Sequence, residues 1–107
     1  MNHGMMSAVI PVFNEERNVE PLMSELKSVL NELVKKKIIS SLETIFVNDG
    51  STDKTQETLE KMKKTEKNLS VIKFRKNFGQ TAALKAGFER ASGEVIVTMD
   101  GDLQNDP

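Results

Sequence analysis

The sequence contains no cysteine, no tryptophan and no tyrosine, and it has a single histidine, His3. Without cysteine there can be no disulfide bonds and no thiolate metal sites, and one histidine excludes a histidine-rich zinc site. No apolar run approaches the about 20 residues that span a bilayer, and the first residues lack the apolar core of a signal peptide. A metal bound by this chain would therefore be held by oxygen atoms.

The chain also lacks a strong net charge. Its formal net charge is -1, although 29% of its 107 residues are charged, and this balance argues against nucleic acid as a partner. The lysine runs at residues 35–37 and 61–67 are typical of solvated helix surface, and we assign them no function. With 37% hydrophobic residues, the chain is expected to form one domain with one core.

Short apolar runs rich in β-branched residues alternate with longer segments of helical period, a pattern typical of parallel βαβ units. Right-handed crossovers then give the strand order 3-2-1-4. We therefore expect an α/β fold, a three-layer Rossmann-like parallel sheet of four strands with helices on both faces. The expected strands are residues 8–13, 44–47, 70–74 and 94–99, and the expected helices are 19–34, a thinly packed one after residue 53, and 80–91.

Two helix starts have recognisable caps. Asn18 is the expected N-cap of the first helix. Asp53, with Gln56 three residues later, fits a capping box for the second, which places Asp49 and Gly50 in the loop before it. Asn48-Asp49-Gly50 also matches a strong hairpin signal, but the residues that follow favour a helix over a returning strand.

Acidic residues follow the carboxyl ends of the expected strands. Asp100 and Asp102 lie one residue apart directly after the fourth strand, and such a pair suits a hard divalent cation with its phosphate, although a solvated turn is the alternative. The strand order places Glu15 and Asp102 on one crevice, where open parallel sheets bind ligands. The pair Glu15 and Glu16 could instead favour only the positive end of the first helix.

The type of nucleotide site can be narrowed further. There is no Gly-x-Gly-x-x-Gly sequence and no P-loop, so a phosphate would be bound through a metal ion. Asp49, near the end of the second strand, is well placed to accept hydrogen bonds from a base or a ribose. Arg75 and Lys76 lie at the end of the third strand, where they either counter phosphate charge or form solvated loop.

Four motifs together carry a resemblance to a known family. They are residues 11–16 (Pro-Val-Phe-Asn-Glu-Glu), 47–53 (Val-Asn-Asp-Gly-Ser-Thr-Asp), 77–88 (from Asn-Phe-Gly-Gln to Ala-Gly-Phe) and 99–104 (Met-Asp-Gly-Asp-Leu-Gln). In this order and spacing they closely resemble the family 2 inverting glycosyltransferases of GT-A type. The nearest look-alikes are polyprenyl-phosphate sugar transferases, of the dolichol-phosphate mannose synthase and undecaprenyl-phosphate sugar transferase kind.

This resemblance implies transfer of a sugar from a UDP-sugar or GDP-sugar to a dolichyl or undecaprenyl phosphate, with inversion at the anomeric carbon. It also implies which side chains take part. The implied donor-nucleotide residues are Pro11, Phe13, Asn14, Glu15, Asn48, Asp49, Lys76 and Asp100. The implied ligands of Mg²⁺ or Mn²⁺ are Asp100, Asp102 and Gln104. Two departures affect the nucleoside pocket, because Asn48 replaces the usual first aspartate of Asp-Asp-Gly-Ser and Phe13 replaces a frequent tyrosine.

The resemblance covers the N-terminal half of a catalytic domain that has roughly two hundred residues or more. We therefore expect residues 1–6 to be a flexible start and residues 7–107 to be the nucleotide-sugar-binding half. The catalytic base is expected downstream, so the isolated chain should not transfer sugar. It should self-associate through the edge of its fourth strand. We expect a cytoplasmic protein, which segments outside this chain could attach to the cytoplasmic face of a membrane.

Other classes of function stay open at this point. A non-catalytic α/β module could bind metal or nucleotide without transferring anything, and a purely structural fragment would bind neither. A nucleotidyltransferase is the nearest rival enzyme, but it usually needs a glycine-rich loop after its first strand, which residues 11–18 lack.

Overall fold

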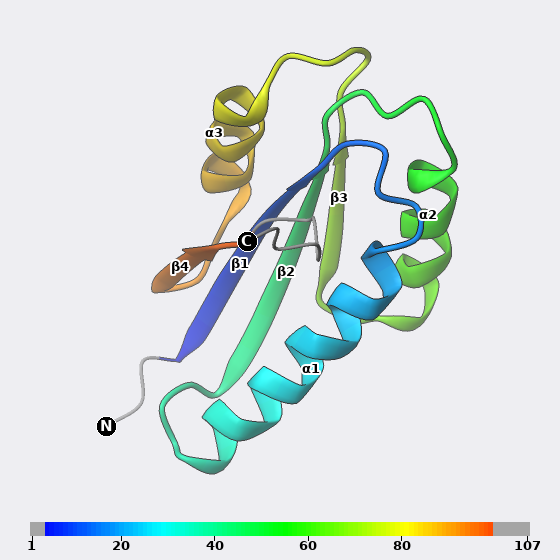
Figure 1. Cartoon of the computed structure of the whole chain (residues 1–107). Helices are drawn as coiled ribbons and strands as arrows, with labels where there is room; N and C mark the ends of the chain where they lie inside the picture. Colours follow the sequence, from blue (N-terminus) through cyan, green and yellow to red (C-terminus); the bar gives the residue numbers. More distant parts are fainter. Residues whose placement is uncertain (1–3, 100–107) are drawn as a thin grey trace, which may run out of the picture.

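The computed structural model describes residues 4–99 and shows a parallel sheet with helices on both faces (Figure 1). The strands are β1 (Met5–Val12), β2 (Ser41–Asn48), β3 (Leu69–Lys73) and β4 (Val95–Thr98). The helices are α1 (Val19–Lys35), α2 (Thr55–Thr65) and α3 (Gln80–Arg90). The strand order is β3-β2-β1-β4 and the three pairings are parallel, so the expected α/β architecture and strand order are confirmed.

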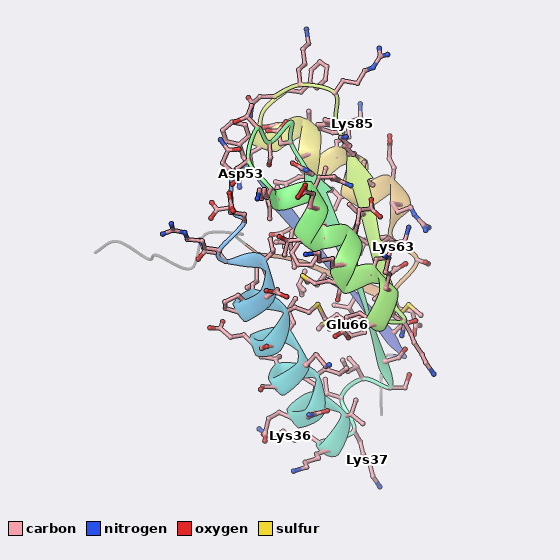
Figure 2. The ribbon with its side chains drawn as sticks, turned by 90° about the vertical axis from the view of Figure 1, so that its right-hand side faces the viewer. Lys36, Lys37, Asp53, Lys63, Glu66 and Lys85 are labelled. Atoms are coloured by element: carbon pink, nitrogen blue, oxygen red, sulfur yellow. The ribbon has the colours of Figure 1, made fainter. Side chains whose placement is uncertain are left out.

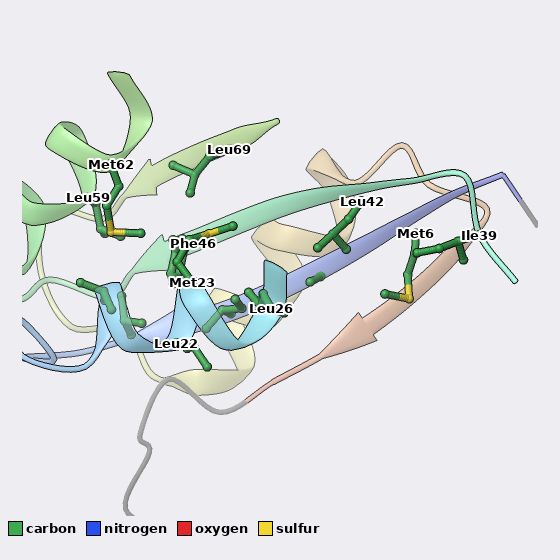
Figure 3. Close-up of a cluster of buried hydrophobic side chains, with 14 residues drawn as sticks. Met6, Leu22, Met23, Leu26, Ile39, Leu42, Phe46, Leu59, Met62 and Leu69 are labelled. Carbon is green, nitrogen blue, oxygen red and sulfur yellow. The ribbon is translucent and has the colours of Figure 1, made fainter. Parts of the chain in front are cut away.

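The core forms because successive residues of the two central strands point to opposite faces of the sheet. On one face, β1 and β2 bury apolar side chains against α1 and α2 (Figure 3). This cluster includes Ala8, Ile10, Val12, Leu22, Leu26, Phe46, Leu59 and Met62. On the other face, Val9, Ile45 and Val47 pack with Ala83 of α3. Central strands buried on both faces read as continuous apolar runs, which is what the sequence shows.

Helix α3 approaches the sheet closely because it presents small residues to it. Ala83 is fully buried, and a Cβ atom added to Gly87 would lie 2.2 Å from Cγ1 of Val9. Its small side chains therefore let this helix pack tightly on the sheet. Helix α2 buries only Thr55, Leu59 and Met62, which agrees with the expected thin packing.

The structure corrects the expectation of a flexible start and excludes the hairpin alternative, as the sequence favoured. Strand β1 begins at Met5, and Met6 is buried and pairs with both β2 and β4, so residues 5 and 6 are not a flexible start. Methionines are flexible enough to fill the end of the core between two strands. The hairpin alternative at Asn48 is excluded, because α2 follows β2 and the next strand is parallel.

Within residues 4–99, no helix is long and apolar enough to cross a membrane.

Candidate functional site

Three loops meet at the carboxyl edge of the sheet, as Figure 1 shows at the top of the view. They are residues 13–18 after β1, residues 49–54 after β2 and residues 74–79 after β3. Strand β4 runs parallel to β1, and the backbone N–H of Met99 donates to the carbonyl of Val9 over 3.1 Å. The carboxyl end of β4 therefore lies beside β1 and points to the edge where these loops lie.

Asn14 joins the first loop to the second. Its φ of 53° lies in the left-handed region, which asparagine adopts more readily than most residues. Its backbone N–H donates to Oγ of Ser51 over 2.9 Å, and its Oδ1 accepts from the backbone N–H of Thr52 over 2.8 Å. The backbone N–H of Asp53 lies 3.3 Å from the same Oδ1. The side chain of Asn14 therefore binds the backbone of the second loop through hydrogen bonds.

Asp53 reinforces this junction, and Figure 2 shows it beside the segment that leads from β1 into α1. Its Oδ1 accepts from both the backbone N–H and the hydroxyl of Thr55, at 2.9 and 2.5 Å, and its Oδ2 lies 3.4 Å from the backbone N–H of Glu16. Burial raises the pKa of Asp53, but the hydrogen bonds from Thr55 and Glu16 outweigh it, so the pKa lies below its ordinary value of 3.8.

The expected capping box at the start of α2 is wrong. The N-cap position is Lys54, whose own side chain makes no capping bond, and Asp53 accepts from the backbone N–H of Thr55, the first residue of the helix. Gln56 does not reach back to Asp53; its Oε1 accepts from Nδ2 of Asn48 over 2.8 Å, and its Nε2 donates to Glu60. Asn48 is buried next to Gln56, and its side-chain amide needs a hydrogen-bond partner. The hydrogen bond between Asn48 and Gln56 therefore competes with the local capping pattern.

Asn18 occupies the N-cap position of α1, as expected, but its side chain makes no capping bond there. Its Nδ2 donates instead to Oε1 of Glu15 over 2.6 Å. The backbone N–H of Glu15 in turn donates to Oγ1 of Thr55 over 2.9 Å. Glu15 is therefore held at the entrance to α1, with its carboxylate next to the helix terminus. At this position the Glu15 carboxylate can interact with the positive end of the α1 dipole, and it can also contact a bound ligand.

Asp49 joins the second loop to the third. It is 5% exposed, and its Oδ1 accepts from the backbone N–H of Phe78 over 2.7 Å. Its Oδ2 accepts from the backbone N–H of Gly79 over 3.0 Å and from Nδ2 of Asn77 over 3.1 Å. The carboxylate therefore lies at the positive end of α3, which begins at Gln80.

The third loop carries an aromatic and cationic surface. Phe78 is 57% exposed, its ring meets that of Phe74 edge to face at a centroid distance of 5.6 Å, and Nζ of Lys76 lies 5.3 Å from its centroid. Lys76 thus sits over Phe78 in a cation–π arrangement.

Two further implied donor residues, Pro11 and Phe13, lie at the end of β1 and the start of the first loop. Pro11 is half-buried in β1 beside Val47, and Phe13 is 43% exposed. Residues 14–18 and Asp53 line a cavity of about 300 Å³. Of the eight implied donor residues, Asn14 is bonded to the second loop and Glu15 to Thr55 at the start of α2. Asp49 is bonded to the loop that carries Lys76. Asn48 faces inward, toward Ser51 and Gln56.

The implied metal ligands cannot be placed, because Asp100, Asp102 and Gln104 lie outside the described residues. Within residues 4–99 there is no cluster of three His, Cys, Asp or Glu side chains that could hold a metal ion.

Residues that the sequence analysis missed connect the loops. Ser51, Thr55 and Asn77 each make a hydrogen bond to another loop. The polar run 48–53 signals that a loop follows β2, but only the assembled sheet shows which residues it contacts. Asn77 lies in the motif at residues 77–88, but the sequence alone predicts no role for it.

Residues 7–107 match the sequence model of the family described as Glycosyl transferase family 2. The chain is 43% identical over 103 residues to the dodecaprenyl-phosphate galacturonate synthase of Rhizobium johnstonii, covering 95% of this chain and 29% of that protein. It is 38% identical to the undecaprenyl-phosphate 4-deoxy-4-formamido-L-arabinose transferase of Pectobacterium carotovorum, covering 95% of this chain and 30% of that protein. The chain thus spans about 30% of the length of these relatives.

Solved structures share the fold. The mannosyltransferase PcManGT from Pyrobaculum calidifontis, in complex with GDP-Man and Mn²⁺, has a TM-score of 0.76 at 23% identity. The match covers 91% of this chain and 27% of that one. S. aureus TarS 1-349 in complex with UDP has a TM-score of 0.71 at 26% identity, with the same two coverages.

Proposed function

The chain belongs to glycosyl transferase family 2, and on that premise we propose that the protein transfers a sugar from a UDP-sugar or GDP-sugar to a polyprenyl phosphate. Two relatives named for dodecaprenyl-phosphate and undecaprenyl-phosphate substrates, at 43% and 38% identity, support this acceptor class. Residues 7–107 are then the N-terminal, donor-binding half of the catalytic domain, and the transfer inverts the anomeric carbon.

The observation that carries the proposal is the convergence of three hydrogen-bonded loops at the carboxyl edge of a parallel sheet. Asn14 ties the first loop to the second, and Asp49 ties the second to the third. Open parallel sheets bind nucleotides at this edge, and preformed loops lower the entropic cost of binding. The proposed donor-binding residues are Pro11, Phe13, Asn14, Glu15, Asn48, Asp49, Lys76 and Asp100.

We place the metal ion, Mg²⁺ or Mn²⁺, on Asp100, Asp102 and Gln104. Two carboxylates and an amide carbonyl are hard oxygen ligands, and this donor set fits either ion. The parallel pairing of β4 with β1 supports the placement, because the carboxyl end of β4 points to the edge of the sheet where the donor-binding loops lie. When bound, such an ion stabilises negative charge on a leaving nucleoside diphosphate.

Within this arrangement the described residues bind and orient the donor. Phe13 and Phe78 are the exposed aromatic side chains of the first and third loops, and each can contact a base by its ring face. Lys76 adds a positive charge to the same edge, where it can attract an anionic diphosphate.

Calorimetric titration of the full-length protein tests the proposal. UDP, GDP and CDP are titrated with and without Mn²⁺ into wild type, Asp102→Ala and the control Glu25→Ala, which removes an exposed carboxylate from α1. We expect one nucleotide to bind in a Mn²⁺-dependent manner, Asp102→Ala to abolish that dependence, and Glu25→Ala to bind as wild type does. Metal binding with no nucleotide dependence would instead favour a non-catalytic metal-binding module.

We further propose that residues 1–107 alone do not transfer sugar, because the base and the acceptor site belong to the other half of the domain. Turnover of a nucleotide sugar onto a polyprenyl phosphate by this chain would contradict the assignment.

The polyprenyl acceptor also implies that the full-length protein works at the cytoplasmic face of a membrane.

A further inference from the structure

We propose that Asn77 is a positioning residue that orients the carboxylate of Asp49 for recognition of the donor nucleoside. The inference rests on the proposed function, because that function gives Asp49 a nucleotide sugar to contact. It adds a residue of the third loop to the site and assigns that residue an indirect role, through Asp49.

The first step of the argument is the geometry of the Asp49 carboxylate. Three donors surround it, the backbone N–H groups of Phe78 and Gly79 and the side-chain amide of Asn77. An ionised carboxylate has about four acceptor positions. These three donors make four hydrogen bonds, since the Gly79 N–H lies 3.0 Å from Oδ2 and 3.3 Å from Oδ1, and together they fix the rotation of the side chain.

The second step is the orientation of the Asn77 amide. Its Nδ2 lies 3.1 Å from Oδ2 of Asp49 and 3.2 Å from the backbone carbonyl oxygen of Asp49. Both partners can only accept hydrogen bonds, so this end of the amide must be the NH₂ group. Although Asn77 is exposed, its amide spans the backbone and the side chain of one residue, which restricts rotation about the bonds between them.

The third step is the way in which the two loops touch. Gly50 packs directly on the peptide that joins Lys76 to Asn77, and a Cβ atom there would lie 2.2 Å from the carbonyl carbon of Lys76. Backbone-to-backbone contact holds Asn77 next to Asp49 at a fixed distance. Of the three donors, only Asn77 contributes a side chain, so it is the one that a substitution can remove without altering the backbone.

The experiment uses the full-length protein and calorimetric titration with UDP and GDP in the presence of Mn²⁺. The variants are Asn77→Ala, which deletes the amide, and Asn77→Asp, which keeps its shape and brings a second carboxylate against Asp49. The matched control is Asn31→Ala, which removes an exposed asparagine from α1. Circular dichroism checks that each variant folds, and the nearly isosteric Asn77→Asp keeps the test valid if Asn77→Ala does not fold.

We expect Asn77→Ala to raise the Kd of the bound nucleotide about tenfold, the order of one hydrogen bond to a charged group. Asn77→Asp should raise it further, because like charges repel, and Asn31→Ala should leave it unchanged. A merely structural role would reduce the number of competent binding sites and leave Kd as it is. The stoichiometry and the Kd, fitted separately, distinguish the two roles.

Two results overturn the inference in different ways. If wild type binds a nucleotide and both Asn77 variants bind it with an unchanged Kd, Asn77 does not position Asp49 and the proposed function stands. If wild type binds neither UDP nor GDP, the proposed donor site itself fails, and the role of Asn77 fails with it.

Discussion

Replacing Gly50 by alanine tests the contact between the second and third loops. The φ of Gly50 is 74°, in the left-handed region that alanine avoids. An added Cβ would lie 2.2 Å from the carbonyl carbon of Lys76 and 2.4 Å from the backbone nitrogen of Asn77. Backbone atoms cannot rotate aside as a side chain can. Gly50→Ala must therefore displace the third loop or strain the second.

Two costs combine in this variant. A left-handed conformation costs a non-glycine residue about 1–2 kcal/mol. Forcing an extra methyl group into a closely packed site typically costs about 1–3 kcal/mol. The free energy of unfolding should therefore fall by about 2–5 kcal/mol, a large part of the about 5–15 kcal/mol that stabilises a typical domain. For a domain of this size, each kcal/mol lowers Tm by about 4–8 °C, so a decrease of at least about 8 °C is expected.

Gly79→Ala is the matched control. The φ of Gly79 is 102°, so alanine is strained there as well, but nothing lies within 4 Å of the added Cβ. Its cost is then that of backbone strain alone, about 1–3 kcal/mol. Urea unfolding followed by circular dichroism measures both variants against wild type.

Amide hydrogen exchange separates displacement of the loop from a general loss of stability. The backbone N–H of Phe78 is bonded to Asp49 in the wild type. Its protection should fall in Gly50→Ala by more than global unfolding explains, and follow global stability in Gly79→Ala. An unfolding free energy of Gly50→Ala within about 0.5 kcal/mol of wild type, or normal protection of Phe78 relative to global stability, would show that the two loops are not in close backbone contact.

Two further predictions concern acid stability and self-association. Because the pKa of Asp53 is lowered in the folded state, its contribution to stability is present above the ordinary value of 3.8 and is lost as pH falls through the folded-state pKa. Urea unfolding between about pH 5 and pH 2 should show a shallower acid decline in Asp53→Asn, and an identical decline would contradict this. The 107-residue chain should self-associate along β4, an outer strand of the described sheet, where Ile96 is 42% exposed. Light scattering should show less association for Ile96→Lys, and a wild-type chain that stays monomeric at high concentration would disprove the prediction.

The fold was predictable because it depends on local periodicity. Val19, Leu22 and Leu26 recur at helical spacing and are buried in the structure. The run from Ala8 to Ile10 alternates between the two faces of the sheet, and all three residues are fully buried. Each pattern needs only a few neighbouring residues to be recognised. The right-handed crossover rule then converts the order of the elements into the strand order.

The candidate site was predictable as a place, but not as a set of contacts. The position of Asp49 at the end of β2 indicated a ligand-binding edge. Its hydrogen-bond partners are 28 to 30 residues away in the sequence, and no local pattern connects them. The expected capping box failed at Gln56, because Asn48 supplies Gln56 with a partner from another element.

The order and type of the elements, the burial of the two central strands and the family can be predicted from the amino-acid sequence alone, since they follow from residue periodicity and short motifs. The contacts between the loops are visible only in the tertiary structure. The left-handed Asn14 receives hydrogen bonds from the second loop, and Gly50 allows two backbones to touch. These contacts join residues that approach one another only when the parallel strands have aligned their carboxyl ends. Hydrogen bonds and close packing depend on distances that the linear order of residues does not specify.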